Sequence, residues 1–153
     1  MLKEFLGFVW RSAPKSVRRW SVRLIEPRFT VTAGAVVEDD DGRILLLNHV
    51  FRKGSGWGIP GGFLSPGEQP EEALRRELRE ETGMEIDSAR LAFVRTLKRP
   101  RQVEIIYRCR VREADKGFKR NIEINTLAWF DRDRLPDVTA DQRRIIARAL
   151  DAD

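Results

Sequence analysis

The sequence predicts an α/β (α+β) fold for residues 29–153. Several segments are rich in β-branched and aromatic residues, which is typical of strands. One helix is expected among them at residues 70–82, and another at residues 140–150. A chain of 153 residues can bury a sizeable core as one domain. Because residues 1–28 differ in composition, we expect them to form a separate N-terminal arm.

Strands are expected on both sides of the central helix. Residues 29–37 and 43–50 form a predicted hairpin, because the Asp-Gly pair at 41–42 is a strong turn signal. Residues 57–60 lead from this hairpin to the helix. The remaining expectations are strands at 91–98, 103–111 and 122–130, a polar loop at 113–120 and a short helical turn at 132–135.

Both helices carry boundary signals. Pro70 suits a first helical turn, and Gly83 is a typical residue just past a helix end. Leu74 and Leu78 supply an apolar stripe for the central helix. Thr139 is a candidate N-cap of the terminal helix. The apolar residues expected to face inward from the terminal helix are Ile145, Ile146, Ala149 and Leu150.

Three carboxylates crowd one side of the central helix. Glu77, Glu80 and Glu81 fall within roughly a quarter of its circumference, at about 100° per residue. Like charges at this spacing destabilise an isolated helix, and sequences break such local rules mostly at functional sites. A hard divalent cation would compensate the repulsion. The alternative is an ordinary exposed Glu/Arg helix with pairs such as Arg76–Glu80.

The surrounding residues form a longer spaced pattern. It runs Gly, five residues, Glu, seven residues, Arg-Glu, an aliphatic, any residue, Glu-Glu, any residue, Gly and an aliphatic. This pattern resembles the Nudix box, and the approach Ile-Pro-Gly-Gly at 59–62 is also similar to that family. All nine specified positions match: Gly62, Glu68, Arg76, Glu77, Leu78, Glu80, Glu81, Gly83 and Met84.

The resemblance implies a fold and a chemistry. The fold would be an α/β/α sandwich with a mixed sheet and a central catalytic helix. The reaction would be hydrolysis of the diphosphate in a nucleoside diphosphate linked to another group, with Mg²⁺ or Mn²⁺ and an activated water. The implied metal ligands are Glu77, Glu80, Glu81 and the Gly61 carbonyl. Glu68 and Arg76 would form a structural ion pair between loop and helix.

The general base has candidates inside and outside the box. Glu81 and Glu77 are the candidates within it. Glu123, followed by an aromatic pair at 129–130, is similar to a late-strand element of the family and is the preferred outside candidate for a base or extra ligand. Glu104 lies in a predicted strand and is the other. Either outside residue is alternatively a solvent-facing strand residue.

Substrate contacts are less defined. Five basic residues are candidates for phosphate contacts, and two aromatic residues for base stacking; solvated charge and core packing are the alternatives. The candidates are Arg52, Lys53, Lys98, Arg99, Arg101, Trp57 and Phe51. No further motif selects a substrate. An RNA 5′-end pyrophosphohydrolase and a catalytically silent nucleotide-sensing module are the other functions considered, and no stable nucleic-acid partner is expected.

The net charge of +5 resides in the arm, which holds seven basic and two acidic residues; the remainder is neutral. This argues against a nucleic-acid-binding catalytic domain. Apolar residues recur at helical spacing up to Ala13, Pro14 interrupts them, and a second apolar face follows from Val17. We expect the arm to pack on its own domain or in a homodimer, with peripheral membrane contact or nucleic-acid contact as alternatives. It resembles neither a secretory signal nor a membrane span.

Cysteine and histidine usage excludes other site chemistries. Cys109 is the single cysteine, so no intramolecular disulfide can form, and a buried thiol is expected within its predicted strand. His49 is the single histidine, which leaves little for a zinc site or a histidine-based triad. A cytoplasmic location is expected.

Overall fold

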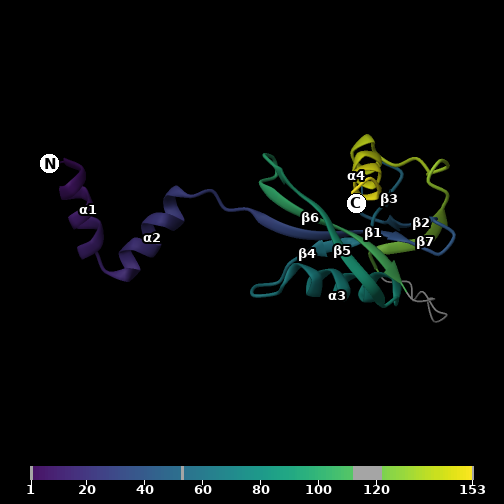
Figure 1. The fold of residues 1–153 in the computed structure, drawn as a ribbon, viewed down its shortest axis with the longest axis horizontal. Coiled ribbons are helices and arrows are strands. Elements are labelled where there is room, and N and C mark those ends of the chain that lie inside the picture. The colour runs from purple at the N-terminus through teal and green to yellow at the C-terminus, as the bar shows by residue number, and fades with distance from the viewer. Residues whose placement is uncertain (1, 53, 112–121, 153) are drawn as a thin grey trace.

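The computed structural model describes residues 2–52, 54–111 and 122–152 (Figure 1). Its centre is a mixed seven-stranded sheet flanked by helices, which confirms the predicted fold class. The strands are β1 (Thr30–Glu38), β2 (Ile44–His49), β3 (Trp57–Gly58), β4 (Gly61–Phe63), β5 (Ile86–Leu97), β6 (Gln102–Val111) and β7 (Ile124–Phe130). The helices are α1 (Leu2–Ser12), α2 (Lys15–Ile25), α3 (Pro70–Thr82) and α4 (Ala140–Leu150).

Strand β1 organises the sheet. It runs parallel to β6 along its whole length, from Thr30 opposite Gln102 to Glu38 opposite Arg110. On its other edge, β1 pairs antiparallel with β4 and then with β2. Strand β2 continues to β3 and β7, while β6 pairs antiparallel with β5. The parallel β1–β6 pair therefore places residues more than 60 positions apart side by side.

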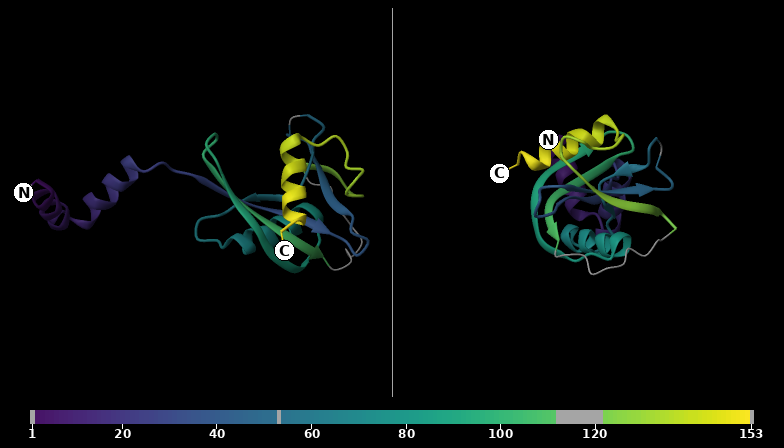
Figure 2. Two further views of the ribbon diagram at one scale, coloured as in Figure 1. Left: turned by 45° about the horizontal axis from the view of Figure 1, so that its top comes forward. Right: turned by 90° about the vertical axis from the view of Figure 1, so that its right-hand side faces the viewer.

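The sheet has helices on both faces, with α3 on one and α4 on the other (Figure 2). Side chains alternate between these faces along β1 and β2, as expected for strands buried on both sides. Ala35, Val37, Leu45 and Leu47 pack with α3, in a core that also includes Leu74 and Leu78. The intervening residues, such as Val36, Ile44 and Leu46, pack with α4 through Ile145, Ile146 and Ala149. Two hydrophobic cores thus hold three layers together.

Both predicted helix ends are formed. The N–H of Gly83 donates to the carbonyl of Arg79 at 2.9 Å, and Gly83 adopts a left-handed φ of 76° that an L side chain disfavours. The Thr139 hydroxyl accepts the N–H of Gln142 at 3.2 Å, which caps α4. The four residues expected to face inward from α4 are all buried.

The arm lies apart from the sandwich. Helices α1 and α2 extend away from β1, as both Figure 1 and the left view of Figure 2 show. Several of its large apolar side chains are exposed. The described part of the arm therefore does not pack on its own domain, which was one of the two arrangements expected; packing in a homodimer was the other. Within the described ranges, no helix is both long and apolar enough to cross a membrane.

Besides shifts of one residue in other strands and the unpredicted short strand β4, three elements differ from expectation. Strand β5 begins at Ile86, because residues 86–90 pair with the end of β6 although their polar pattern gives little strand signal. Strand β7 begins at Ile124 and leaves Ile122 exposed. Residues 132–134 form turns and no helix follows them before Pro136. The polar loop predicted at 113–120 lies outside the described residues.

Candidate active site

Helix α3 places two of its carboxylates against the short strand β4. Gly61 donates its backbone N–H to Oε2 of Glu81 at 3.1 Å. At the next residue, a Cβ added to Gly62 would lie 2.3 Å from the carboxyl carbon of Glu77. The missing side chain at Gly62 is therefore what allows Glu77 to approach the strand. Gly61, Gly62 and the two box glutamates therefore form one contact between helix and sheet.

Glu81 is the most buried of the box carboxylates, with 7% of its surface exposed. Burial raises the pKa of its carboxyl to about 8, despite the hydrogen bond from Gly61. The negative charges of Glu77 and Glu123 raise this pKa further, whereas the nearby positive charge of Arg52 lowers it. Glu81 therefore lies where several charges meet with little water.

Arg76 ties the loop before α3 to the helix. Its Nε donates to Oε1 of Glu68 at 2.8 Å, and one Nη donates to Oε2 of Glu68 at 3.1 Å. The same side chain donates to the carbonyl of Phe63 at 3.1 Å and to Glu77 at 2.8 Å. Hydrogen bonds from Arg76 and from the Ser65 backbone lower the pKa of Glu68 to about 2. The Glu68–Arg76 pair therefore has bidentate geometry, which fixes direction as well as distance.

The three carboxylates of α3 carry oxygen donors of the kind that a hard divalent cation takes, but their side chains point to different partners. Among the described residues, no three acidic, histidine or cysteine side chains are grouped so that they could hold an ion. Glu77 and Glu80 both point to Arg76, the latter at 3.5 Å, while Glu81 points to Gly61. The fit is supported by the raised pKa of buried Glu81, whose ionised form a cation would stabilise.

A cavity of about 200 Å³ adjoins these carboxylates on the α4 side of the sheet. We call it the α4-side cavity. Gly61 and Gly62 line it and also contact Glu81 and Glu77, so β4 is a wall shared by the cavity and the carboxylates. The other lining residues are Thr32, Ala33, Gly34, Arg52, Ile59, Pro60, Phe63, Gln102, Glu104, Ile106, Gln142 and Ile145.

Arg52 lines the cavity with a partly buried guanidinium. One of its Nη atoms is buried and has no hydrogen-bond partner among the described residues. The guanidinium fills the space beside Gly58, where an added Cβ would lie 1.3 Å from that atom. Burial lowers the pKa of Arg52, and the charge of Glu81 opposes this effect. A buried cation with an unused donor is suited to an anionic oxygen of a ligand.

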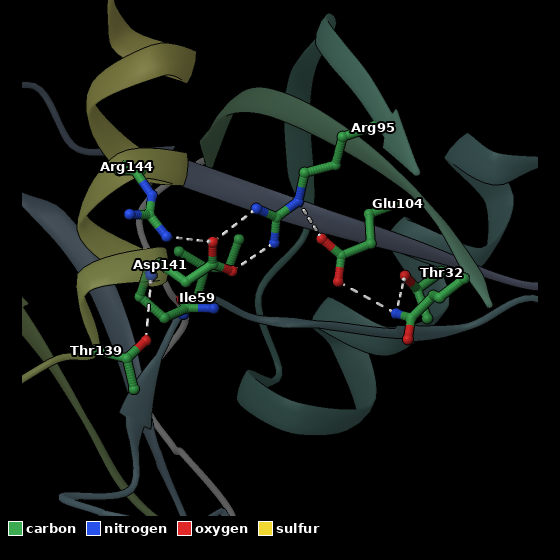
Figure 3. A network of polar contacts seen from close by, with 9 residues as sticks. Thr32, Ile59, Arg95, Glu104, Thr139, Asp141 and Arg144 are labelled. Carbon is green, nitrogen blue, oxygen red and sulfur yellow. Dashed lines mark hydrogen bonds and ion pairs between the residues drawn. The ribbon is translucent and has the colours of Figure 1, made fainter. Parts of the chain in front are cut away.

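Glu104 is held in a network on the cavity wall (Figure 3). Arg95 donates to one of its carboxylate oxygens, and Gln102 donates to the other at 3.2 Å. Arg95 also forms two hydrogen bonds with Asp141 of α4, at 2.9 and 2.6 Å. Glu104 therefore already has two partners that orient it.

Glu123 is exposed and acts electrostatically on Glu81. It lies just before β7, and its backbone carbonyl accepts the N–H of Val50 at 2.8 Å. Its charge is close enough to raise the pKa of Glu81. Glu123 and Glu104 thus differ: the former acts on Glu81, and the latter lies on the cavity wall.

Other candidate substrate residues lie elsewhere. Trp57 packs edge-to-face on Phe130, with ring centroids 5.0 Å apart, and does not line the cavity. Arg99 and Arg101 lie exposed in the turn between β5 and β6 and are not among the lining residues. Phe51 is exposed beside Arg52, and Lys53 lies outside the described residues.

Sequence reasoning missed three polar residues of the cavity wall, which are Thr32, Gln102 and Gln142. The Gln102 amide donates to the Thr32 hydroxyl at 2.9 Å, and the Gln142 side-chain oxygen accepts the N–H of Ile59 at 3.0 Å. They come from β1, β6 and α4 and meet only through the sheet order. The sequence offers one local signal, for Gln102: its spacing from Glu104 and Ile106 places all three on one strand face.

Comparisons with known proteins agree with this geometry. A family model described as NUDIX domain matches residues 28–149. A MutT-like protein of Streptomyces ambofaciens is 31% identical over 128 residues, covering 82% of this chain and 78% of that protein. An RNA pyrophosphohydrolase of Pseudomonas putida is 35% identical over 69 residues, which are 44% of this chain and 42% of that protein.

A solved structure shows the same architecture. The crystal structure of a MutT NUDIX hydrolase from Burkholderia pseudomallei has a TM-score of 0.68 and 28% identity, covering 80% of this chain and 98% of that one. The family match extends from the residues before β1 to the last turn of α4, and it includes the box carboxylates and the residues that line the cavity. This chain therefore belongs to the Nudix family of hydrolases.

Proposed function

We propose that this protein hydrolyses the diphosphate linkage of a nucleoside diphosphate joined to another group, by attack of water on phosphorus. The observation that carries the proposal is the shared wall at β4. Gly61 and Gly62 contact the Glu81 and Glu77 carboxylates and also line the α4-side cavity. A substrate bound in the cavity would therefore have its phosphates beside the carboxylates.

The carboxylates are proposed to hold the metal. Glu77, Glu80 and Glu81, with the carbonyl of Gly61, supply the oxygen donors that Mg²⁺ or Mn²⁺ prefers. When bound, the cation would neutralise diphosphate oxygens and lower the pKa of a coordinated water. Glu68 has a different role, because its pairing with Arg76 holds the loop in place.

Glu81 is the preferred general base. It is the most buried of the box carboxylates, and it contacts Gly61, which also lines the cavity. The hydrogen bond from Gly61 orients one of its oxygens. Glu77 and Glu123 are the alternative bases, since both act electrostatically on Glu81.

Arg52 is proposed to bind a substrate phosphate. Its buried Nη atom lacks a partner among the described residues, and the side chain lines the cavity and interacts electrostatically with Glu81. A phosphate oxygen would satisfy this donor. The polar wall formed by Gln102, Glu104 and Gln142 would then face the remainder of the substrate.

A panel of nucleoside-diphosphate compounds, with product identification, tests the proposal. Purified protein with Mg²⁺ or Mn²⁺ is expected to release products cleaved at the diphosphate. Glu80→Gln and Glu81→Gln should lower kcat by about 10²-fold or more, because each removes a charge while keeping volume. Glu71→Gln is the matched control, since Glu71 pairs with Arg75 on the exposed part of α3. No turnover on any compound, or undiminished turnover in the Glu81→Gln protein, would contradict the proposal.

RNA is the second candidate substrate. The observation that favours it is the relative of Pseudomonas putida described as an RNA pyrophosphohydrolase, although the match covers less than half of either chain. The panel should therefore include a 5′-triphosphorylated RNA. If the basic arm guides RNA, binding should weaken steeply with salt. A silent nucleotide-sensing module is less well supported, because Glu77, Glu80 and Glu81 are all retained.

A further inference from the structure

The apolar side chains of the arm are exposed on both of its helices. On α1, Phe5 and Phe8 are each 64% exposed. On α2, Trp20 is 65% and Leu24 70% exposed, and Val17 lies on the same side. Together with two serines, these α2 residues line an open apolar depression. Exposed apolar surface on this scale marks an interaction site in a soluble domain.

Positive charge accompanies this apolar surface. The arm accounts for the whole net charge of +5, while residues 29–153 are neutral. Helix α2 contains Lys15, Arg18, Arg19 and Arg23 and no acidic residue. The partner must therefore accept apolar side chains and positive charge at the same place.

We propose that the arm binds the surface of an anionic lipid bilayer, with α1 and α2 lying in the interfacial region. Helices with tryptophan, phenylalanine and leucine on one face and basic residues elsewhere bind there, through buried apolar area and attraction to anionic headgroups. Each helix has 11 residues and is about 16 Å long, so neither could cross a hydrocarbon core of about 30 Å. Pro14 lies between the two helices.

Two other occupants fit less well. In a dimer formed through the arms, two arms of charge +5 would repel each other. A dimer formed by an arm on the partner's domain would pair the positive arm with a domain of no net charge. A nucleic acid would match the charge and stack on tryptophan, but Val17 and Leu24 would stay exposed to water. A lipid surface satisfies both properties, and the extended position of the arm leaves the catalytic domain clear of it (Figure 1).

Co-sedimentation of the full chain with vesicles tests the proposal. Vesicles of phosphatidylcholine alone are compared with vesicles containing about one quarter phosphatidylglycerol. We expect at least about tenfold stronger partitioning onto the anionic vesicles at low salt, and a decrease as salt is raised, because the attraction is screened. Equal binding to both vesicle types, or none to either, would overturn the proposal.

A matched pair of double variants separates the arm from general surface effects. Trp20→Glu with Leu24→Glu should lower partitioning by about tenfold or more, because two anchors become acidic. Leu91→Glu with Val94→Glu makes the same charge change at exposed apolar positions of β5 and should bind like the parent. Circular dichroism of both proteins verifies folding. Equal losses in the two variants would refute a specific role of the arm.

Two further measurements test whether the arm binds a second copy of the chain or a nucleic acid. Sedimentation velocity tests whether the parent chain is a dimer that the Trp20→Glu, Leu24→Glu variant dissociates. A single-stranded RNA oligomer tests nucleic-acid binding by the same pair of proteins. If the variant loses dimerisation or RNA binding while the parent never binds anionic vesicles, the lipid proposal is wrong. Hydrolysis of soluble substrate is independent of these outcomes.

Discussion

His49 shows how burial can give one residue a role in pH-dependent stability. Its Nε2 atom is buried without a hydrogen-bond partner among the described residues. Burial lowers the pKa of the imidazole to about 4, and the positive charge of Arg52 contributes in the same direction. The folded protein therefore keeps His49 neutral at pH values where the unfolded chain, with a pKa near 6.5, binds a proton.

The His49 shift predicts a loss of stability on acidification. Between about pH 6.5 and 4 the unfolded state binds more protons, so the free energy of unfolding falls as pH falls. Partial exposure limits the effect to about 1–2 kcal/mol. It is measured as the difference in unfolding free energy between the parent and His49→Gln, determined by urea denaturation at several pH values.

Taking this difference removes contributions shared by both proteins. Glu81 is the main one, since its raised pKa makes stability fall as pH rises through about 4.5 to 8, the opposite sign. His49 is the single histidine, so no other imidazole contributes. Parallel pH profiles for the two proteins would show that His49 does not supply the effect.

At the scale of elements, β3 is built around Arg52. Gly58 has no side chain, and the guanidinium of Arg52 occupies the position that a Cβ would take, 1.3 Å from one Nη atom. The nearest other side-chain atom is the oxygen of Gln142, at 3.2 Å. Any side chain at position 58 would therefore displace the guanidinium of Arg52.

Gly58→Ala is expected to displace Arg52 and leave the fold intact, because the obstructing atoms are at the end of a flexible side chain. On the proposed phosphate contact, kcat/KM should fall about 10- to 100-fold, as for loss of a charged hydrogen bond. Arg52→Gln should give a similar loss. Combining both should add little, since they remove the same contact. Fully additive losses, or a large fall in the free energy of unfolding, would contradict this explanation.

The elements with the strongest local signals are those that sequence predicted best. Helix α3 spans the expected residues because Pro70, its apolar stripe and Gly83 all indicate the same boundaries. The predicted start of β5 is five residues too late, because Asp87, Ser88 and Arg90 give no local strand signal. This stretch is in a strand because it pairs with β6. Such boundaries are set by pairing between strands that are distant in the sequence, and a local pattern holds no information about that pairing.

The candidate site divides in the same way. The carboxylates lie on one helix, so their spacing places them without knowledge of the fold. Their different surroundings do not follow from spacing: Glu81 is buried against Gly61, whereas Glu80 is exposed near Arg76. The wall residues Gln102 and Gln142 come from separate layers and meet only when β6 lies beside β1. Local sequence carries little information about such meetings.

At the scale of the whole molecule, polar contacts join the α4 layer to the sheet beside the cavity. Arg95 of β5 holds Asp141 of α4 through two hydrogen bonds and also contacts Glu104 of β6 (Figure 3). Hydrogen bonds from Arg95 lower the pKa of Asp141. Because this pKa is lowered, the pair contributes stability at neutral pH that is lost as pH falls below the ordinary aspartate pKa of about 3.9.

A double-mutant cycle measures how strongly this contact couples α4 to the sheet. We expect Arg95→Met and Asp141→Asn to show a coupling of about 1–2 kcal/mol in the free energy of unfolding at pH 7. This is larger than for a simple surface pair, because the contact is bidentate and Arg95 is largely buried. The cycle cancels the favourable interaction of Asp141 with the start of α4, which both backgrounds share. Asp133→Asn, the same charge change at an exposed turn, should not couple to Arg95. The coupling should shrink as pH falls below the ordinary aspartate pKa of about 3.9, because protonation removes the charge of Asp141. A coupling near zero at pH 7 would mean that this contact does not help to hold α4 on the sheet.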